Sequence, residues 1–277
     1  MAQQETDDAT EDAPGAVALG SSNCSHDEDA DDGAGAIGYQ LPLESLAPQT
    51  APRELASFVV IVLHGYGMKN TEMYEWLRRM TADRQHIRFV FPQAPQRLVY
   101  DASNSERDID RGATYCTSWF EYTSDFEGKR EDSIDRKSLK ESRLLLIQMV
   151  EAESARLESY PRGPRLDRIG IVGVSQGGCM AIDLCTHVAL RFCVTLVAHK
   201  MSGTTGSLRT NWHAINATAD EIYPLSWARE TLGSALTCDY VDDFHDLGKT
   251  AVEVDRLLEQ RLDEYLPRGA SVSAGSS

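Results

Sequence analysis

The hydrophobic and polar positions form two patterns that alternate along the chain from about residue 58 onward. Short, almost unbroken apolar runs are typical of parallel strands that are covered on both faces. Longer segments with apolar residues at helical spacing lie between these runs. The apolar runs predict strands over 58–65, 87–95, 168–175, 192–199 and 212–217, with a weaker candidate over 237–244. The periodic segments predict helices over 71–83, 135–158, 177–190, 225–236 and 249–266.

Strands that alternate with helices predict an α/β fold, in which a mostly parallel central sheet carries helices on both faces. Ligands of such sheets bind beyond the carboxyl ends of the strands. We therefore expect functional side chains in the residues that directly follow each predicted strand. The longest apolar run, FVVIVL at 58–63, is far too short to span a bilayer, so no integral membrane segment is expected.

Composition divides the chain into a tail and a folded part. Residues 1–52 contain no Lys or Arg and eleven Asp or Glu, so they hold most of the net charge of −16. Such a segment cannot bury enough apolar surface to offset the entropy of ordering it. We predict a disordered acidic tail over 1–37, one folded domain over 38–267 and a short disordered tail over 268–277. The alternative for the acidic tail is an arm that binds a partner.

The acidic composition and the cysteine pattern argue against several classes of partner and site. An acidic chain repels phosphate backbones, so nucleic acid is not an expected partner. The acidic start lacks the features of a secretory signal or transit peptide, and we expect a cytoplasmic protein with free thiols. None of the six cysteines forms a CxxC pair, so no metal site is expected. Cys179 and Cys185 are expected to be small buried residues of a helix.

The strongest chemical signal is Gly173-Val174-Ser175-Gln176-Gly177, which fits G-x-S-x-G between a predicted strand and a predicted helix. This context is typical of a nucleophile elbow, because glycines two positions before and after the serine remove clashes in a tight turn. The helix that follows presents N–H groups to a developing oxyanion. The alternative is a Gly-rich turn with a buried structural serine.

A serine nucleophile needs a base, and the base needs an acid that orients it. Among seven histidines only His245 follows the best acid candidate, and it lies in the loop between the last predicted strand and the last predicted helix. That acid is Asp220, three residues past the predicted strand 212–217, with Glu221 as its competitor. The alternative for His245 is a solvated loop histidine.

An oxyanion hole needs two backbone N–H donors. One is expected from Gln176, the residue after the nucleophile, and the other from the loop LHGYG at 63–67, where the Tyr66 amide is the candidate. We interpret His64 in the same loop as a structural residue that packs beneath it.

The motifs LHGYG, FPQAP, SWFEY, GIVGVSQGG and ADEIYP, followed by His245, resemble the phospholipase/carboxylesterase family, which includes acyl-protein thioesterases and lysophospholipases. Its members usually show H-G-x-G-D, W-F-D, G-F-S-Q-G-G and H-G-x-x-D-x-x-V-P, and this chain departs from that pattern at Met68, Glu121 and Asn216-Ala217. The resemblance spans about residues 38–267. It implies an α/β-hydrolase fold with no large cap domain and hydrolysis of an ester or thioester by Ser175, His245 and Asp220, with no metal or organic cofactor.

The resemblance leaves several functions open. Protein depalmitoylation is favoured, with lysophospholipase and short-chain carboxylesterase as enzyme alternatives and a catalytically silent binding module as the non-enzyme alternative. The stretch 96–128 is expected to form the wall of an acyl pocket lined by Trp119 and Phe120, whose alternative role is to anchor this stretch to the core. The expected partners are a small ester, an acylated protein or a lysolipid, and the chain is expected to be a monomer or weak dimer.

Overall fold

The computed structural model describes residues 56–82, 84–100, 113–122, 134–157, 165–201, 204–232 and 237–266. The tails predicted over 1–37 and 268–277, and the start of the predicted domain, lie outside the described residues. The described elements are β1 (Phe58–Leu63), α1 (Asn70–Ala82), β2 (Ile87–Val90), β3 (Gln96–Tyr100), β4 (Ala113–Thr117), α2 (Arg136–Leu157), a 3₁₀ turn (Leu166–Arg168), β5 (Ile169–Val174), α3 (Gln176–His187), β6 (Phe192–Leu196), β7 (Trp212–Ala217), α4 (Leu225–Leu232), β8 (Thr237–Val241) and α5 (Ala251–Tyr265).

The predicted parallel sheet is confirmed. Six strands are hydrogen-bonded in the order β2-β1-β5-β6-β7-β8, and each neighbouring pair is parallel. The weak candidate over 237–244 is β8, at one edge of this sheet. A separate antiparallel pair, β3 and β4, occupies part of the stretch 96–128. The described residues include no large cap domain.

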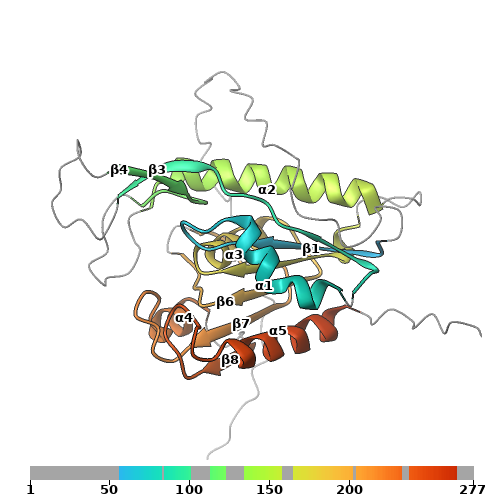
Figure 1. Ribbon diagram of the computed structural model, residues 1–277. Coiled ribbons are helices and arrows are strands. Elements are labelled where there is room, and N and C mark those ends of the chain that lie inside the picture. Colours follow the sequence, from blue (N-terminus) through green and yellow to red (C-terminus); the bar gives the residue numbers. More distant parts are fainter. Residues whose placement is uncertain are drawn as a thin grey trace, which may run out of the picture. The chain divides into compact units, whose positions relative to one another are not determined.

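Alternate residues of the strands face two different cores, which is why the apolar runs are unbroken. In β1, Val59, Ile61 and Leu63 pack in the cluster that includes residues of α2, α3 and α4. Val60 and Val62 pack in the other cluster, with residues of α1 and α5. Figure 1 shows α2 and α5 on opposite sides of the strands. The helices therefore cover both faces of the sheet, as expected.

Several strands end earlier than their apolar runs predict. The run over 87–95 forms a strand only to Val90, and the run over 192–199 only to Leu196. The residues that follow leave the sheet but stay buried, among them Phe91 and Ala198. Val197 has a φ of 43°, which a continuing strand does not allow. The apolar runs therefore include buried loop residues at the carboxyl edge of the sheet as well as the residues of the strands.

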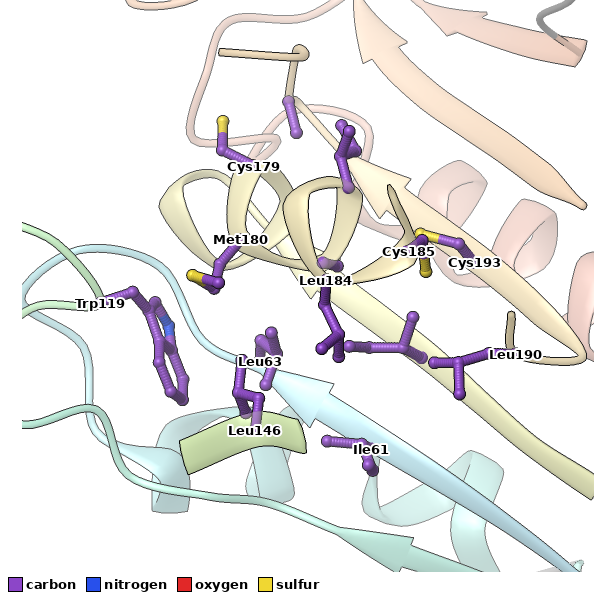
Figure 2. Close-up of a cluster of buried hydrophobic side chains, with 14 of the residues drawn as sticks. Ile61, Leu63, Trp119, Leu146, Cys179, Met180, Leu184, Cys185, Leu190 and Cys193 are labelled. Atoms are coloured by element: carbon purple, nitrogen blue, oxygen red, sulfur yellow. The ribbon is translucent and has the colours of Figure 1, made fainter. Parts of the chain in front are cut away.

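Cys179 and Cys185 are buried on a helix, as the sequence predicts. Cys179 and Cys185 on α3 and Cys193 on β6 are free thiols with no exposed surface. Figure 2 shows them within a cluster of buried hydrophobic side chains that includes Leu63 of β1 and Leu184 of α3. The helix that follows Ser175 is thus packed firmly against the sheet.

Candidate active site

Ser175 lies in a strained turn between β5 and α3. Its backbone has a φ of 52° and a ψ of −123°, a region that residues other than glycine rarely adopt. The main chain holds this conformation at both sides, because the Ser175 N–H donates to Leu196 O at 2.9 Å and Ser175 O accepts from the Cys179 N–H at 3.0 Å. The side chain is partly exposed. The turn therefore presents the Ser175 hydroxyl at the carboxyl edge of the sheet.

The glycines around Ser175 allow the close approach of three backbone segments. A Cβ atom at Gly173 would lie 2.4 Å from Gly177 O, and one at Gly177 would lie 2.4 Å from His64 O. Real Cβ contacts are essentially never shorter than 3.0 Å. Only glycine at these two positions lets the first turn of α3 pack against both the end of β5 and the loop after β1.

The structure brings Ser175, Asp220 and His245 together from three separate loops. His245 Nε2 lies 2.8 Å from Ser175 Oγ, and His245 Nδ1 lies 2.9 Å from each carboxylate oxygen of Asp220. The side chains of His245 and Asp220 are 16% and 2% exposed. An imidazole held in this way can accept a proton from the hydroxyl while the carboxylate orients it.

Backbone N–H groups orient the carboxylate of Asp220. Those of Ile222 and Tyr223 donate to Asp220 Oδ1 at 2.9 and 2.7 Å. These bonds close a turn directly after Asp220, a local geometry that aspartate favours. The carboxylate is therefore fixed by its own loop, independently of its contact with the imidazole.

Asp243 fixes the loop that carries His245. Its buried side chain accepts hydrogen bonds from the Thr250 N–H at 2.6 Å, the Thr250 hydroxyl at 2.7 Å and the Phe244 N–H at 2.8 Å. Loss of solvation opposes ionisation of this carboxyl, but the bonds from Thr250 and Phe244 outweigh it and hold the pKa of Asp243 below its ordinary value. Asp243 O also accepts from the Ala219 N–H at 3.0 Å, which joins this loop to that of Asp220.

Two other described carboxylates, those of Glu221 and Asp239, have different partners. Glu221 is exposed, and its side chain accepts a bond from the His245 backbone N–H at 3.2 Å instead of from the imidazole. Asp239 bonds to His213 at 2.8 Å and also pairs with Arg261. Asp220 is therefore the only described carboxylate with a hydrogen bond to the His245 ring.

The loop after β1 lies directly beside Ser175. A Cβ atom at Gly65 would be 3.4 Å from the Ser175 Cβ, so Tyr66 is one residue from this contact. The Gly67 N–H donates to Thr117 O at 2.9 Å and holds the loop. Tyr66 and Gln176 thus adjoin the serine from two segments, and the oxyanion-hole role of their amides stays a prediction.

The side chain of Gln176 has a second role that sequence reasoning missed. It is fully buried, accepts a bond from the Trp119 N–H at 2.9 Å and donates to Phe120 O at 2.9 Å. It thereby fixes the segment 118–120 to the first turn of α3. The sequence signal for this role was a long polar side chain among the small residues that follow the strand in GVSQGG.

Trp119 and Phe120 lie in the core. They are only 2% and 0% exposed and belong to a buried core cluster, and their role in lining an acyl pocket stays a prediction. Figure 2 shows Trp119 among these core side chains, and its indole N–H donates to His64 O at 2.8 Å. They anchor the segment to the core, which was the alternative interpretation. Much of the remaining predicted wall, 101–112 and 123–128, lies outside the described residues.

His64 is the structural residue that the sequence predicts. It has no exposed surface, its Nε2 accepts from the Ala94 N–H at 2.9 Å, and its Nδ1 lies 2.7 Å from Gly65 O. Burial disfavours the charged ring and lowers the pKa of His64 below its ordinary value. A neutral ring with its proton on Nδ1 satisfies both bonds.

The described part of the chain lacks two features that would bear on function. No group of three or more His, Cys, Asp or Glu side chains there could hold a metal ion. No helix among the same residues has both the length and the apolar character needed to cross a membrane.

Comparison with known proteins places the chain in a family. Residues 49–222, more than half of the chain, match the family model described as Phospholipase/Carboxylesterase. The chain belongs to the phospholipase/carboxylesterase family. This is an α/β-hydrolase family of esterase and thioesterase type, and the predicted resemblance is confirmed. A search of curated proteins found no match.

Solved structures of this type show the same fold at low sequence identity. SOBER1 from Arabidopsis thaliana is 18% identical with a TM-score of 0.57, over 74% of this chain and 99% of that one. Acyl-protein thioesterase 2 from Zea mays is 18% identical with a TM-score of 0.52, over 76% and 96%. A carboxylesterase from Bacillus cereus is 16% identical with a TM-score of 0.53, over 75% and 88%. At these identities the likeness supports the α/β-hydrolase fold alone.

Proposed function

We propose that this chain is a serine hydrolase that cleaves carboxylic ester or thioester bonds, with Ser175 as nucleophile, His245 as base and Asp220 as the orienting acid. The observation that carries the proposal is the unbroken line of hydrogen bonds from Ser175 Oγ through the imidazole to Asp220, at 2.8 and 2.9 Å. Family membership supports the same reaction class.

In the first half of the reaction, Ser175 Oγ attacks the carbonyl carbon of the substrate while its proton passes to His245 Nε2. Negative charge develops on the carbonyl oxygen, where the amides of Tyr66 and Gln176 are suited to donate hydrogen bonds. Collapse of this intermediate releases the alcohol or thiol, which takes the proton from His245, and leaves an acyl group on Ser175.

In the second half, His245 takes a proton from water, and the resulting hydroxide attacks the acyl carbon. The proton returns to Ser175 as the carboxylic acid leaves. Asp220 stabilises the imidazolium in both halves and keeps Nδ1 protonated, so Nε2 stays free to exchange protons with substrate.

Among substrates, acylated protein is the favoured class, with lysophospholipids and short-chain esters as alternatives within the same chemistry. The structural neighbours include an acyl-protein thioesterase and a carboxylesterase, so ester and thioester substrates are both included in the test.

The test is hydrolysis of matched p-nitrophenyl esters and acyl thioesters of increasing chain length by the full chain. We expect turnover by the wild type, loss of at least about 10³-fold in Ser175→Ala, and unchanged turnover in Ser226→Ala. Ser226 is an exposed serine on α4 and serves as the matched control. Equal, measurable rates for wild type and Ser175→Ala would overturn the role of Ser175, and folded wild type without turnover would favour a silent binding module.

A further inference from the structure

The ring of Tyr223 lies against the imidazole of His245. The two ring centroids are 5.0 Å apart and the planes are nearly perpendicular at 85°. The Tyr223 ring also contacts the His199 ring edge-on, with 4.7 Å between the ring centroids. The His199 ring in turn contacts Trp227, with 5.7 Å between the centroids. Tyr223 is only 4% exposed, so the ring is held in a packed environment.

The hydroxyl of Tyr223 connects this packing to the opposite side of the site. It lies 3.1 Å from the hydroxyl of Tyr122. The centroid of the Tyr122 ring lies 5.4 Å from that of Phe120, which belongs to the segment that Gln176 fixes. It lies 5.8 Å from the centroid of Tyr66, which belongs to the loop beside Ser175. A series of aromatic contacts therefore runs from the predicted oxyanion loop to the base.

Hydrogen bonds alone do not fully fix a histidine ring. The second side-chain torsion of histidine has a broad energy profile, so the tilt of the ring depends on what packs against it. In His245 the two nitrogen atoms are directed by Ser175 and Asp220, and the described ring contact is Tyr223. A small misplacement of a reacting group can reduce turnover by as much as about 10²-fold.

We propose that Tyr223 is a positioning residue for His245, and that its ring sets the tilt of the imidazole toward Ser175. This inference rests on the proposed function of Ser175 and His245. The Tyr122–Tyr223 hydroxyl pair acts one step further away, because it holds the Tyr223 ring and does not contact the imidazole.

Valine is the informative substitution at this position. It is an aliphatic residue and cannot supply the aromatic ring that lies against His245. The Tyr223 N–H bond to Asp220 comes from the main chain, so Tyr223→Val retains it. The substitution removes the ring together with its hydroxyl, and the main-chain hydrogen bond that orients Asp220 is preserved.

The test compares Tyr223→Val, Tyr223→Phe and Tyr122→Phe with p-nitrophenyl acetate as substrate. We expect Tyr223→Val to lower kcat by about 10- to 100-fold with KM changed by less than about threefold. The ring is kept in Tyr223→Phe, so most of the turnover should be restored. Tyr122→Phe breaks the same hydroxyl pair from its other end and should match Tyr223→Phe.

Rates are expressed per active site, from the burst of p-nitrophenol or from titration with a fluorophosphonate, so a partly unfolded variant does not imitate the effect. A wild-type kcat per active site in Tyr223→Val would overturn the inference, as would a Tyr223→Phe variant as slow as Tyr223→Val. If Tyr223→Val yields no folded protein, Tyr223→Leu is measured in the same way. A wild type without turnover would instead overturn the proposed function.

Discussion

Both carboxylate oxygens of Asp220 lie 2.9 Å from Nδ1 of His245. The two residues are 25 positions apart in the sequence and come from the loops after β7 and β8. The carboxylate is almost fully buried, and the imidazole reaches Ser175 with its other nitrogen. The predictions below follow from this arrangement and from the contacts that hold it.

Replacement of Asp220 by Asn should lower kcat by about 10³- to 10⁴-fold, because the amide would favour the wrong tautomer of His245. Glu221→Gln is the matched control, since the described hydrogen bond of this neighbouring carboxylate is to the His245 backbone N–H and not to its ring. It should retain turnover within about threefold of the wild type. Ester hydrolysis at pH 7.5 measures both variants, and equal losses would contradict the role of Asp220.

Gly177→Ala should destabilise the fold by about 1–3 kcal/mol or more, because the new methyl group would lie 2.4 Å from His64 O and 2.6 Å from Leu63 O. Gly248→Ala is the control, because its nearest contact, Asp246, is an ordinary 3.7 Å away. Chemical denaturation measures the free energy of unfolding of each variant. An equally small effect at both positions would show that the elbow is less tightly packed than described.

Gln176→Ala should lower stability by about 1–3 kcal/mol, because it leaves the buried Trp119 N–H without its acceptor and removes one of the two hydrogen bonds that Phe120 O accepts, the other coming from the Ser118 hydroxyl. The backbone amide of residue 176 is retained. Hydrogen exchange should become faster in 118–120 while the strands β6 and β7 stay protected. Gln260→Ala on the exposed surface of α5 is the control and should change neither property.

Stability should fall in mild acid partly because of His64. Burial lowers its folded-state pKa below the ordinary value of about 6.5, so below that pH the unfolded chain binds a proton that the folded chain does not. The free energy of unfolding then decreases as pH falls, with a slope of at most about 1.4 kcal/mol per pH unit from this group. His64→Gln should show a shallower pH dependence between pH 7.5 and 5. Equal slopes for the two proteins would contradict the neutral buried ring.

The sequence predicted the parts of the fold that depend on local patterns. The unbroken apolar runs of β1 and β5 report burial on both faces, and Gly173 and Gly177 report the tight turn around Ser175. The order of Ser175, Asp220 and His245 along the chain was sufficient to select three residues that meet in space. Neither the apolar pattern nor the motifs marked the β3–β4 pair, since its strands lie within a stretch assigned as a whole to a pocket wall.

The parts that the sequence did not predict depend on contacts between distant residues. Gln176 meets Trp119 across 57 positions, and Tyr223 meets Tyr122 across 101. No local periodicity reports such pairs. The sequence left two roles open for Trp119 and Phe120 for the same reason, because their burial depends on His64, α2 and α3 as well as on their own segment.

The central claim is that Ser175 is the activated nucleophile, and covalent labelling tests it most directly. The intact protein is treated with a fluorophosphonate probe, and the modified residue is located by peptide mass spectrometry. We predict one adduct on Ser175, no adduct in Ser175→Ala, and much slower labelling in His245→Ala than in His213→Gln. Folded wild-type protein that acquires no adduct, or acquires it at another serine, would contradict the account.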